Sequence, residues 1–333
     1  MGQTTRIWVS PTLTRGHSLS TLRHLPGRLE FFLNMSIINK AIVVLLPLVP
    51  KILVSRFARP YIAGETLDDA VAKVKTLTDE GCVATMDVLG EEVLGREETE
   101  AFTEQYLEVL ERIDTEKLKS NISVKPTALG LDIDLELCEA NLRRLLVRAS
   151  ELNNFVRIDM EDSTTTTNTL NLYRKLREDF DNVGVVLQSY FFRSMDDIKS
   201  LIPFGVSVRV CKGIYVEPKE IAYKNRQEIR DNFMDMVETL LNANCYVGIA
   251  THDRQLVERS VKMINDMGLD TDKYEFQMLL GVEANLRRQI ITDGHKMRVY
   301  IPYGQQWYAY STRRLKENPA VAGHVFKNLF AAR

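Results

Sequence analysis

Four residues near the C-terminus have types and a spacing that could bind an amino acid. Tyr310, Arg313, Arg314 and Glu317 recur at intervals of three and four, so a helix would carry them on one face. Two adjacent arginines on such a face could hold a carboxylate in a bidentate clamp. A solvated helix face with one weak ion pair is the alternative interpretation.

Aromatic residues lie in and just before this stretch. They are Tyr300, Tyr303, Trp307 and Tyr310. Aromatic rings pack well against an apolar ring and can present a hydroxyl or indole N–H to a polar group. An aromatic box beside a carboxylate clamp suits a small cyclic or apolar amino acid.

A second group of cations, Arg209 and Lys212, lies in an apolar run that ends at Gly213. Three positions apart, the two side chains point to different faces of a straight strand unless its end turns. At the end of a strand they suit an anionic group such as a phosphate or a reduced flavin ring, and Gly213 lets the backbone approach a ligand closely. Rim charges on a solvated surface are the alternative.

Lys125 and Asp159 lie in neighbouring apolar runs of the sequence. A buried ammonium is costly unless it is paired, so we expect these two residues to form an ion pair. The pair could anchor a substrate or simply close one layer of the core. A third interpretation is a Schiff-base lysine, Lys125 or Lys212, of the kind that barrel aldolases use.

The elements that must position these residues repeat along the chain. Helical patterns, among them 65–81, 135–152, 219–241 and 253–267, accompany eight short apolar runs. The runs are 82–90, 121–130, 155–162, 183–190, 206–213, 246–252, 274–281 and 297–304. This alternation predicts a parallel sheet covered by helices, and eight units predict an α/β fold of the (β/α)8 TIM-like barrel type. An open doubly wound sheet is the alternative, but no GxGxxG motif follows a strand.

Composition excludes several classes of protein. The 333 residues include 45% hydrophobic and 26% charged residues, and 43 Lys plus Arg face 45 Asp plus Glu. These values are typical of a globular protein and argue against a disordered chain or a dedicated nucleic-acid binder. The four cysteines form no CxxC pair, which argues against a zinc ribbon and for a reducing compartment. The histidines show no ligand spacing, so no metal site is expected.

The N-terminal part of the chain differs from the rest. Residues 1–34 hold four arginines and a single acid, Glu30, which is the composition of a mitochondrial transit peptide. A true start at Met35 is favoured, because 1–34 lacks an amphipathic stripe. We expect 35–64 to be a short helical lead-in with at most a shallow membrane contact, and 65–333 to be one catalytic barrel.

Taken together, seven motifs resemble those of the FAD-dependent proline dehydrogenases, in the short monofunctional bacterial form. They occur in order from about residue 65 to 330. The motifs are Ser-Val-Lys at 123–125, Arg-Ile-Asp-Met-Glu at 157–161, Gln-Ser-Tyr at 188–190, Arg-Val-Cys-Lys-Gly-Ile-Tyr at 209–215, Ala-Thr-His at 250–252, Glu-Phe-Gln-Met-Leu at 275–279 and Tyr-Ser-Thr-Arg-Arg-Leu-Lys-Glu-Asn at 310–318. Val210, Cys211, Ile214 and Val216 depart from the residues more usual in that family.

The resemblance implies a role for each site residue. The carboxylate of proline would be held by Arg313 and Arg314. Its ring would be packed by Tyr215, Leu279, Tyr300 and Tyr310, with Lys125 and Asp159 nearby. The FAD would be bound by Gln188, Arg209, Lys212, Gly213, Thr251, His252, Gln277 and Glu317.

The reaction implied is oxidation of L-proline at C5 to Δ1-pyrroline-5-carboxylate, the first step of proline catabolism to glutamate. Electrons would pass to a membrane quinone, and a separate pyrroline-5-carboxylate dehydrogenase would follow. The expected location is the cytoplasm, peripheral to the inner membrane, or the mitochondrial matrix if 1–34 is a transit peptide. The alternatives are a flavin-dependent folate reductase, a Schiff-base aldolase and a proline-sensing module without turnover.

Overall fold

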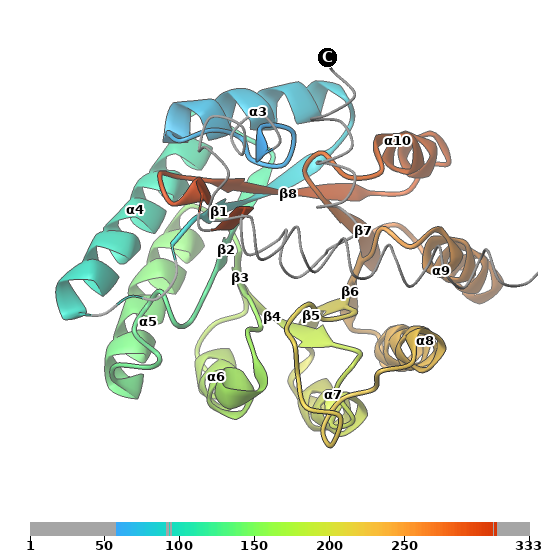
Figure 1. The fold of residues 1–333 in the computed structure, drawn as a ribbon. Helices are drawn as coiled ribbons and strands as arrows, with labels where there is room; N and C mark the ends of the chain where they lie inside the picture. The colour runs from blue at the N-terminus through green and yellow to red at the C-terminus, as the bar shows by residue number, and fades with distance from the viewer. Residues whose placement is uncertain (1–57, 91–92, 94, 309, 312–333) are drawn as a thin grey trace, which may run out of the picture. The chain divides into compact units, whose positions relative to one another are not determined.

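The computed structural model describes residues 58–90, 93, 95–308, 310 and 311. Eight parallel strands close into a barrel in the order β1 to β8, with β8 paired to β1 (Figure 1). This confirms the predicted barrel. The strands are β1 Val83–Val88, β2 Ser120–Val124, β3 Val156–Ile158, β4 Val183–Gln188, β5 Ser207–Cys211, β6 Tyr246–Ala250, β7 Tyr274–Leu279 and β8 Met297–Tyr303. The predicted leader, 1–34, and most of the lead-in, 35–64, lie outside the described residues.

Helices surround the barrel and connect successive strands (Figure 1). Those that follow β1 to β7 are α4 Arg96–Thr115, α5 Leu135–Glu151, α6 Ser163–Arg177, α7 Ser194–Leu201 with the 3-10 turn η2 Ile202–Phe204, α8 Arg226–Asn242, α9 Arg254–Met267 and α10 Ala284–Thr292. The helix α3, Leu67–Asp79, precedes β1 and packs against both β1 and β8. It therefore covers the junction where the barrel closes.

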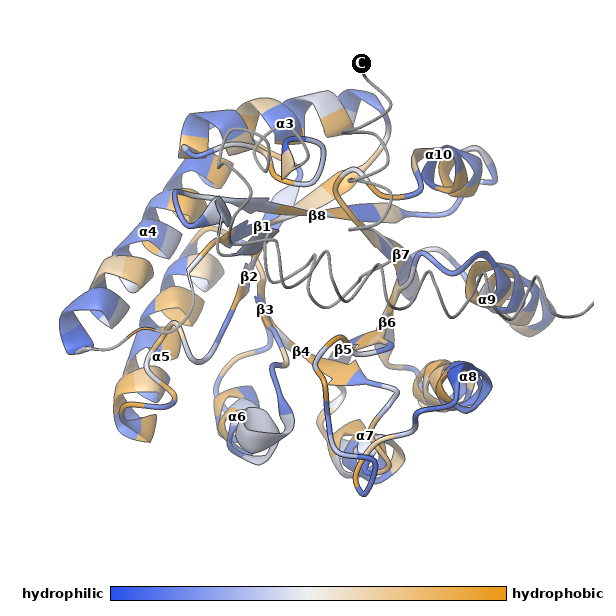
Figure 2. Cartoon of the chain, in the orientation of Figure 1, coloured by the Kyte–Doolittle hydropathy of each residue, from blue (hydrophilic) through white to orange (hydrophobic). Residues whose placement is uncertain are grey.

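Several strands, such as β1 and β7, alternate between apolar and polar residues, whereas β4 and β6 are the largely apolar runs that we expected. In β1, Ala84 and Met86 are buried in the hydrophobic core, whereas Asp87 bonds to residues of other strands inside the barrel. Each helix in Figure 2 carries both hydrophobic and hydrophilic residues. The hydrophobic core thus lies between the strands and the helices, and the barrel interior is free to hold polar side chains.

Local capping explains where several helices begin. Four helices start beside an Asp or Asn side chain that accepts a backbone N–H of the first turn, namely Asp134 for α5, Asp162 for α6, Asn225 for α8 and Asp253 for α9. The start predicted for α8, at residue 219, was seven residues early because Asn225 accepts the Gln227 N–H at 2.7 Å. The second strand ends at Val124 rather than 130, since the Pro126 carbonyl accepts N–H groups of a turn.

An ion-pair group lies at the amino ends of the strands. Glu275 is 1% exposed and accepts hydrogen bonds from Arg298 Nε at 2.5 Å and Nη2 at 3.0 Å. Lys296 lies 3.6 Å away from the same carboxylate. Burial raises the pKa of Glu275, but Arg298 and Lys296 outweigh burial and lower that pKa to about 2. The carboxylate is therefore ionised whenever the protein is folded near neutral pH.

Replacing Glu275 with Gln should lower the free energy of unfolding at pH 7 by about 3–5 kcal/mol, because the largely buried Arg298 loses its charge partner. The lowered pKa of Glu275 means that its contribution is complete above its ordinary value of 4.5 and declines as the pH falls toward about 2. The difference between wild type and Glu275→Gln should therefore shrink below pH 4.5. Equilibrium urea unfolding at pH 7 and pH 4 measures both effects.

The control is Glu111→Gln, which removes an exposed partner of Arg148 and should cost less than about 1 kcal/mol. Equal losses in the two variants would contradict the importance assigned to the buried pair.

Candidate active site

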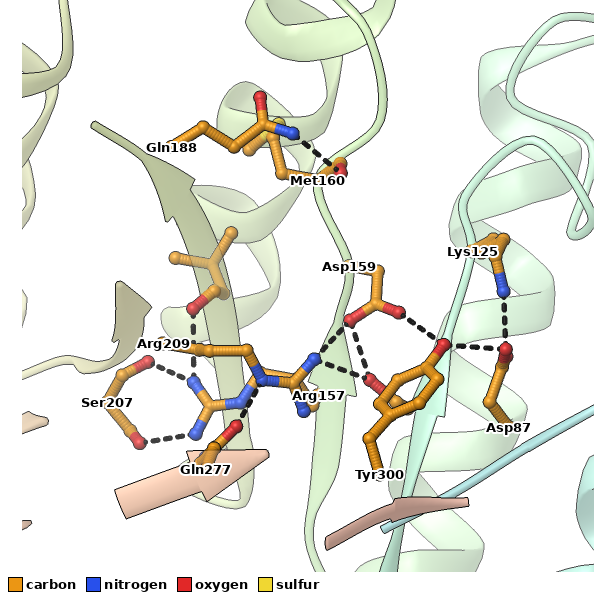
Figure 3. A network of polar contacts seen from close by, with 12 residues as sticks. Asp87, Lys125, Arg157, Asp159, Met160, Gln188, Ser207, Arg209, Gln277 and Tyr300 are labelled. Carbon is orange, nitrogen blue, oxygen red and sulfur yellow. Dashed lines mark hydrogen bonds and ion pairs between the residues drawn. The ribbon is translucent and has the colours of Figure 1, made fainter. Parts of the chain in front are cut away.

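Asp87, at the carboxyl end of β1, is a fully buried carboxylate with three donors, two of which, Lys125 and Tyr300, are drawn in Figure 3. Its Oδ2 accepts hydrogen bonds from Lys125 Nζ at 2.6 Å and from the Tyr300 hydroxyl at 2.6 Å. Its Oδ1 accepts one from the Tyr106 hydroxyl at 2.9 Å. Strands β1, β2 and β8 and the helix α4 thus meet at one carboxylate, as a buried charge requires.

Asp159, just after β3, is the centre of a second group of contacts (Figure 3). Its Oδ1 accepts hydrogen bonds from the Ser123 hydroxyl at 2.6 Å and from Arg209 Nη1 at 2.7 Å. The Tyr300 hydroxyl lies 3.2 Å from Oδ2 of this carboxylate. Tyr300 therefore connects the two carboxylates, and it belongs to both groups.

The predicted ion pair between Lys125 and Asp159 is wrong in its partner, because Lys125 pairs with Asp87. The strand that precedes Lys125 has a neighbour on each side, β1 and β3, and the sequence did not show which neighbour supplies the acid. Asp87 was missed. The available signal was an acid in an otherwise apolar run, at even spacing from Thr85.

The protonation states follow from these contacts. Burial lowers the pKa of Lys125, but the carboxylates of Asp87 and Asp159 outweigh burial, so the pKa lies above its ordinary 10.5. Burial and the same two acids raise the pKa of Tyr300 well above 10. Lys125 is thus a fixed ammonium and Tyr300 a neutral donor, and a Schiff-base role for Lys125 loses its chemical basis.

Arg209 lies inside the barrel and links β5 to the opposite strands. Besides its bond to Asp159, its Nε donates to Gln277 Oε1 at 2.5 Å, and its guanidinium lies 5.6 Å from the centre of the Tyr300 ring. Gln277 in turn donates to Glu275 at 2.7 Å. A glycine is required beside this amide, since a Cβ at Gly248 would lie 2.5 Å from Gln277 Nε2.

Lys212 lies on the rim rather than beside Arg209. Its Nζ is 3.1 Å from Asp253 Oδ2, which also accepts a hydrogen bond from Arg230 Nε at 2.8 Å. Burial raises the pKa of Asp253, but Arg230 and Lys212 outweigh burial and lower it. Thr251 is buried and its hydroxyl accepts the Asp253 N–H at 3.1 Å. The two cations therefore enter the mouth at different depths and do not share a partner.

The other predicted residues at the strand ends have well-defined partners. His252 Nε2 accepts the Leu279 N–H at 2.8 Å, and this hydrogen bond favours the tautomer with the proton on Nδ1. Gln188 donates to two backbone carbonyls and accepts from the Tyr190 hydroxyl at 3.1 Å. Gly213 has a φ of +101°, and a Cβ there would lie 1.5 Å from the Tyr190 ring. Only glycine fits this turn.

Aromatic residues that we predicted near the carboxylate clamp lie in the described part of the chain, but the clamp itself does not. Tyr310 is buried, with Trp307 packed against its cluster, and Tyr215 is half-buried on the loop after β5. Arg313, Arg314 and Glu317 lie outside the described residues. The barrel mouth thus brings Lys125, Asp159, Arg209, Gln277 and Tyr300 into one network, with Lys212, Thr251 and His252 on the rim.

The family model for proline dehydrogenase matches residues 70–327, a span that contains the whole barrel. The chain belongs to the proline dehydrogenase family. It has the activity of a proline dehydrogenase, an oxidoreductase that catalyses the first step of proline catabolism. Membership in this family argues against the two alternative functions, an aldolase and a folate reductase.

Relatives and solved structures agree with this membership. Proline dehydrogenase 2 of Bacillus subtilis (strain 168) is 34% identical over 275 residues, which cover 82% of this chain and 90% of that protein. Proline dehydrogenase of Deinococcus radiodurans is 33% identical over 277 residues, covering 82% and 89%. The crystal structure of proline utilization A from Bdellovibrio bacteriovorus, inactivated by N-propargylglycine, matches with a TM-score of 0.74 and 26% identity. That match covers 79% of this chain and 32% of the longer protein.

Replacing Asp87 with Asn should lower the free energy of unfolding by about 3–5 kcal/mol, because the buried Lys125 ammonium loses its charged partner. Equilibrium urea unfolding measures the loss. The matched control is Tyr106→Phe, which removes a neutral donor from the same carboxylate and should cost only about 1–2 kcal/mol. A smaller loss for Asp87→Asn than for Tyr106→Phe would show that Asp87 is not the main partner of Lys125.

Proposed function

We propose that this proline dehydrogenase uses FAD, bound at the mouth of the barrel, to oxidise L-proline to Δ1-pyrroline-5-carboxylate. The observation that carries this proposal is the network that fixes Lys125, Asp159, Arg209 and Tyr300 at the carboxyl ends of the strands. In barrels of this type the loops after the strands converge at that end, and catalytic residues gather there.

The residues of the mouth suit an anionic cofactor with a flat ring. Arg209 and Lys212 bring two positive charges to it, and His252 keeps a protonated Nδ1. Gly213 allows the backbone after β5 to approach a ligand more closely than any other residue would. Gln188, Thr251, Gln277 and Glu317 complete the set that we expect to hold the cofactor. Bound FAD supplies the hydride acceptor for C5 of proline.

Substrate binding rests on a clamp and a rigid wall. Arg313 and Arg314 hold the carboxylate of proline, and this fixes one end of the substrate. Tyr215, Leu279, Tyr300 and Tyr310 pack the ring. Tyr300 contributes a wall that does not move, since its hydroxyl is held between Asp87 and Asp159. Fixing both ends of a small substrate supplies orientation, which is a large share of the rate acceleration.

The charged residues of the mouth are held in fixed positions by their partners. Lys125 remains an ammonium because Asp87 holds its pKa above the ordinary value. Asp159 is fixed by Ser123 and Arg209, so it presents its second oxygen toward Tyr300 in a set direction. These preorganised charges need not rearrange when the substrate enters.

The electron acceptor is a membrane quinone, and a separate pyrroline-5-carboxylate dehydrogenase takes up the product. The enzyme then acts in the cytoplasm with a peripheral contact to the inner membrane. In the described part of the chain, no helix is long and apolar enough to cross a bilayer. Turnover with a soluble quinone analogue, compared with turnover under oxygen alone, tests this acceptor.

The purified full-length chain should show flavin absorbance that is bleached by anaerobic L-proline. The expected result reports cofactor, substrate and electron transfer in one ultraviolet–visible measurement. D-proline provides the control, because a clamp at one end and a wall at the other distinguish the two stereoisomers. A flavin spectrum that L-proline leaves unchanged would support a binding module without turnover.

Replacing Arg313 with Met should raise the KM for proline tens- to hundreds-fold, because a charged hydrogen-bond partner contributes roughly 2–4 kcal/mol. The flavin content should stay the same. Steady-state kinetics measure the effect, and Arg288→Met, which removes an exposed arginine of α10, is the matched control with an unchanged KM. An unchanged KM for Arg313→Met would reject the clamp.

A further inference from the structure

A cavity of about 650 Å³ opens at the end of the barrel opposite the proposed active site. It is lined by residues at the amino ends of the strands and by the loops that precede them. Five cations face it, namely Lys117, Lys119, Arg157, Lys296 and Arg298, against two carboxylates, Asp114 and Glu275. Proline oxidation at the other end of the barrel uses none of these groups.

Arg157 is the unusual member of this set. It is 3% exposed, and its three hydrogen bonds go to neutral oxygens, the Val185 and Ser207 carbonyls and the Ser207 hydroxyl (Figure 3). No described carboxylate lies within 4.0 Å of its guanidinium. Burial and the nearby Arg209 outweigh the attraction of Glu275, and they lower the pKa of Arg157 to about 9. A buried cation without a carboxylate is costly, so its retention needs a reason.

The chain makes room for this guanidinium. A Cβ at Gly184 would lie 2.3 Å from Arg157 Nη1 and 2.7 Å from the Phe155 ring. Arg157 also lies 5.0 Å from the centre of that ring, a cation–π distance. Residues in or next to β3 and β4 therefore fix the position of the Arg157 guanidinium.

The cations that line this cavity outnumber the carboxylates that they can pair with. Arg298 and Lys296 both use Glu275, and Lys117 uses Asp114. The exposed Lys119 has no ion-pair partner among the described residues. A network built only to stabilise the barrel would match its charges, whereas this cavity has an excess of positive charge next to a space large enough for a small molecule.

We propose that this cavity binds a phosphate group, either free or carried by a small metabolite. A phosphate accepts several charge-assisted hydrogen bonds at once, which suits a guanidinium and lysines that approach from different strands and loops. Its charge compensates the cations that Glu275 and Asp114 leave in excess.

Calorimetric titration of the full chain with inorganic phosphate, against sodium chloride of equal ionic strength, tests the proposal. Saturating FAD is present throughout, so that phosphate at the barrel mouth is excluded. We expect saturable binding, with a Kd raised about tenfold by Lys119→Ala and by Lys296→Met, since each removes a charged contact. Lys262→Ala, on α9, removes an exposed, paired lysine that does not line the cavity and should leave the Kd unchanged.

Glycerol 3-phosphate in a parallel titration distinguishes the two sources of the group. Tighter binding than inorganic phosphate indicates a phosphorylated metabolite, and equal or weaker binding indicates free phosphate. Lys119→Ala should turn over proline at the wild-type rate, which separates this site from the active site. No saturable binding beyond chloride, or an unchanged Kd in both lining variants, would overturn the proposal.

Discussion

A charged side chain inside a closed barrel has little contact with water and needs a partner of opposite charge, and this constraint organises the interior. Each carboxylate that β1, β3 and β7 place there is held by cations from other strands: Asp87 by Lys125, Asp159 by Arg209 and Glu275 by Arg298. Each of these charge pairs joins two different strands or the residues that directly follow them, so the oppositely charged partner always comes from another part of the barrel. The same pairs therefore link the strands of the closed barrel and fix charged side chains at both of its ends.

The polar interior depends on precise spaces as well as on charges. Gly184 and Gly248 leave room for the Arg157 guanidinium and the Gln277 amide inside the barrel. On the rim, Asp253 caps α9 and also binds Lys212 and Arg230, so the start of a helix fixes the position of a cation. A side chain that performs two such tasks tolerates few replacements.

The sequence predicted the barrel because apolar runs and helical patterns repeat eight times, and this signal depends only on local spacing. The family resemblance further assigned Asp159, Arg209, Gln277 and Tyr300 to one active site, and the structure brings these four residues into one network. The partner of Lys125 could not be predicted, because strand order permits two neighbours and only the three-dimensional register chooses between them. The start of α8 was missed because an Asn cap is a weak signal beside an extended helical pattern. The carboxylate clamp of Arg313 and Arg314 and the anion-binding role of Arg209 and Lys212 were also hypotheses from residue type and spacing, whereas the roles of the remaining site residues came from the family resemblance.

The hydroxyl of Tyr300 carries a single proton and has two acids as neighbours, at 2.6 Å and 3.2 Å. It can donate to only one of them at a time. The same heavy-atom arrangement therefore has two hydrogen-bond isomers, which differ in whether Asp87 or Asp159 accepts the hydrogen bond from the Tyr300 hydroxyl. Rotation of one O–H bond converts one isomer into the other, so the balance of negative charge across the mouth can shift without movement of any strand.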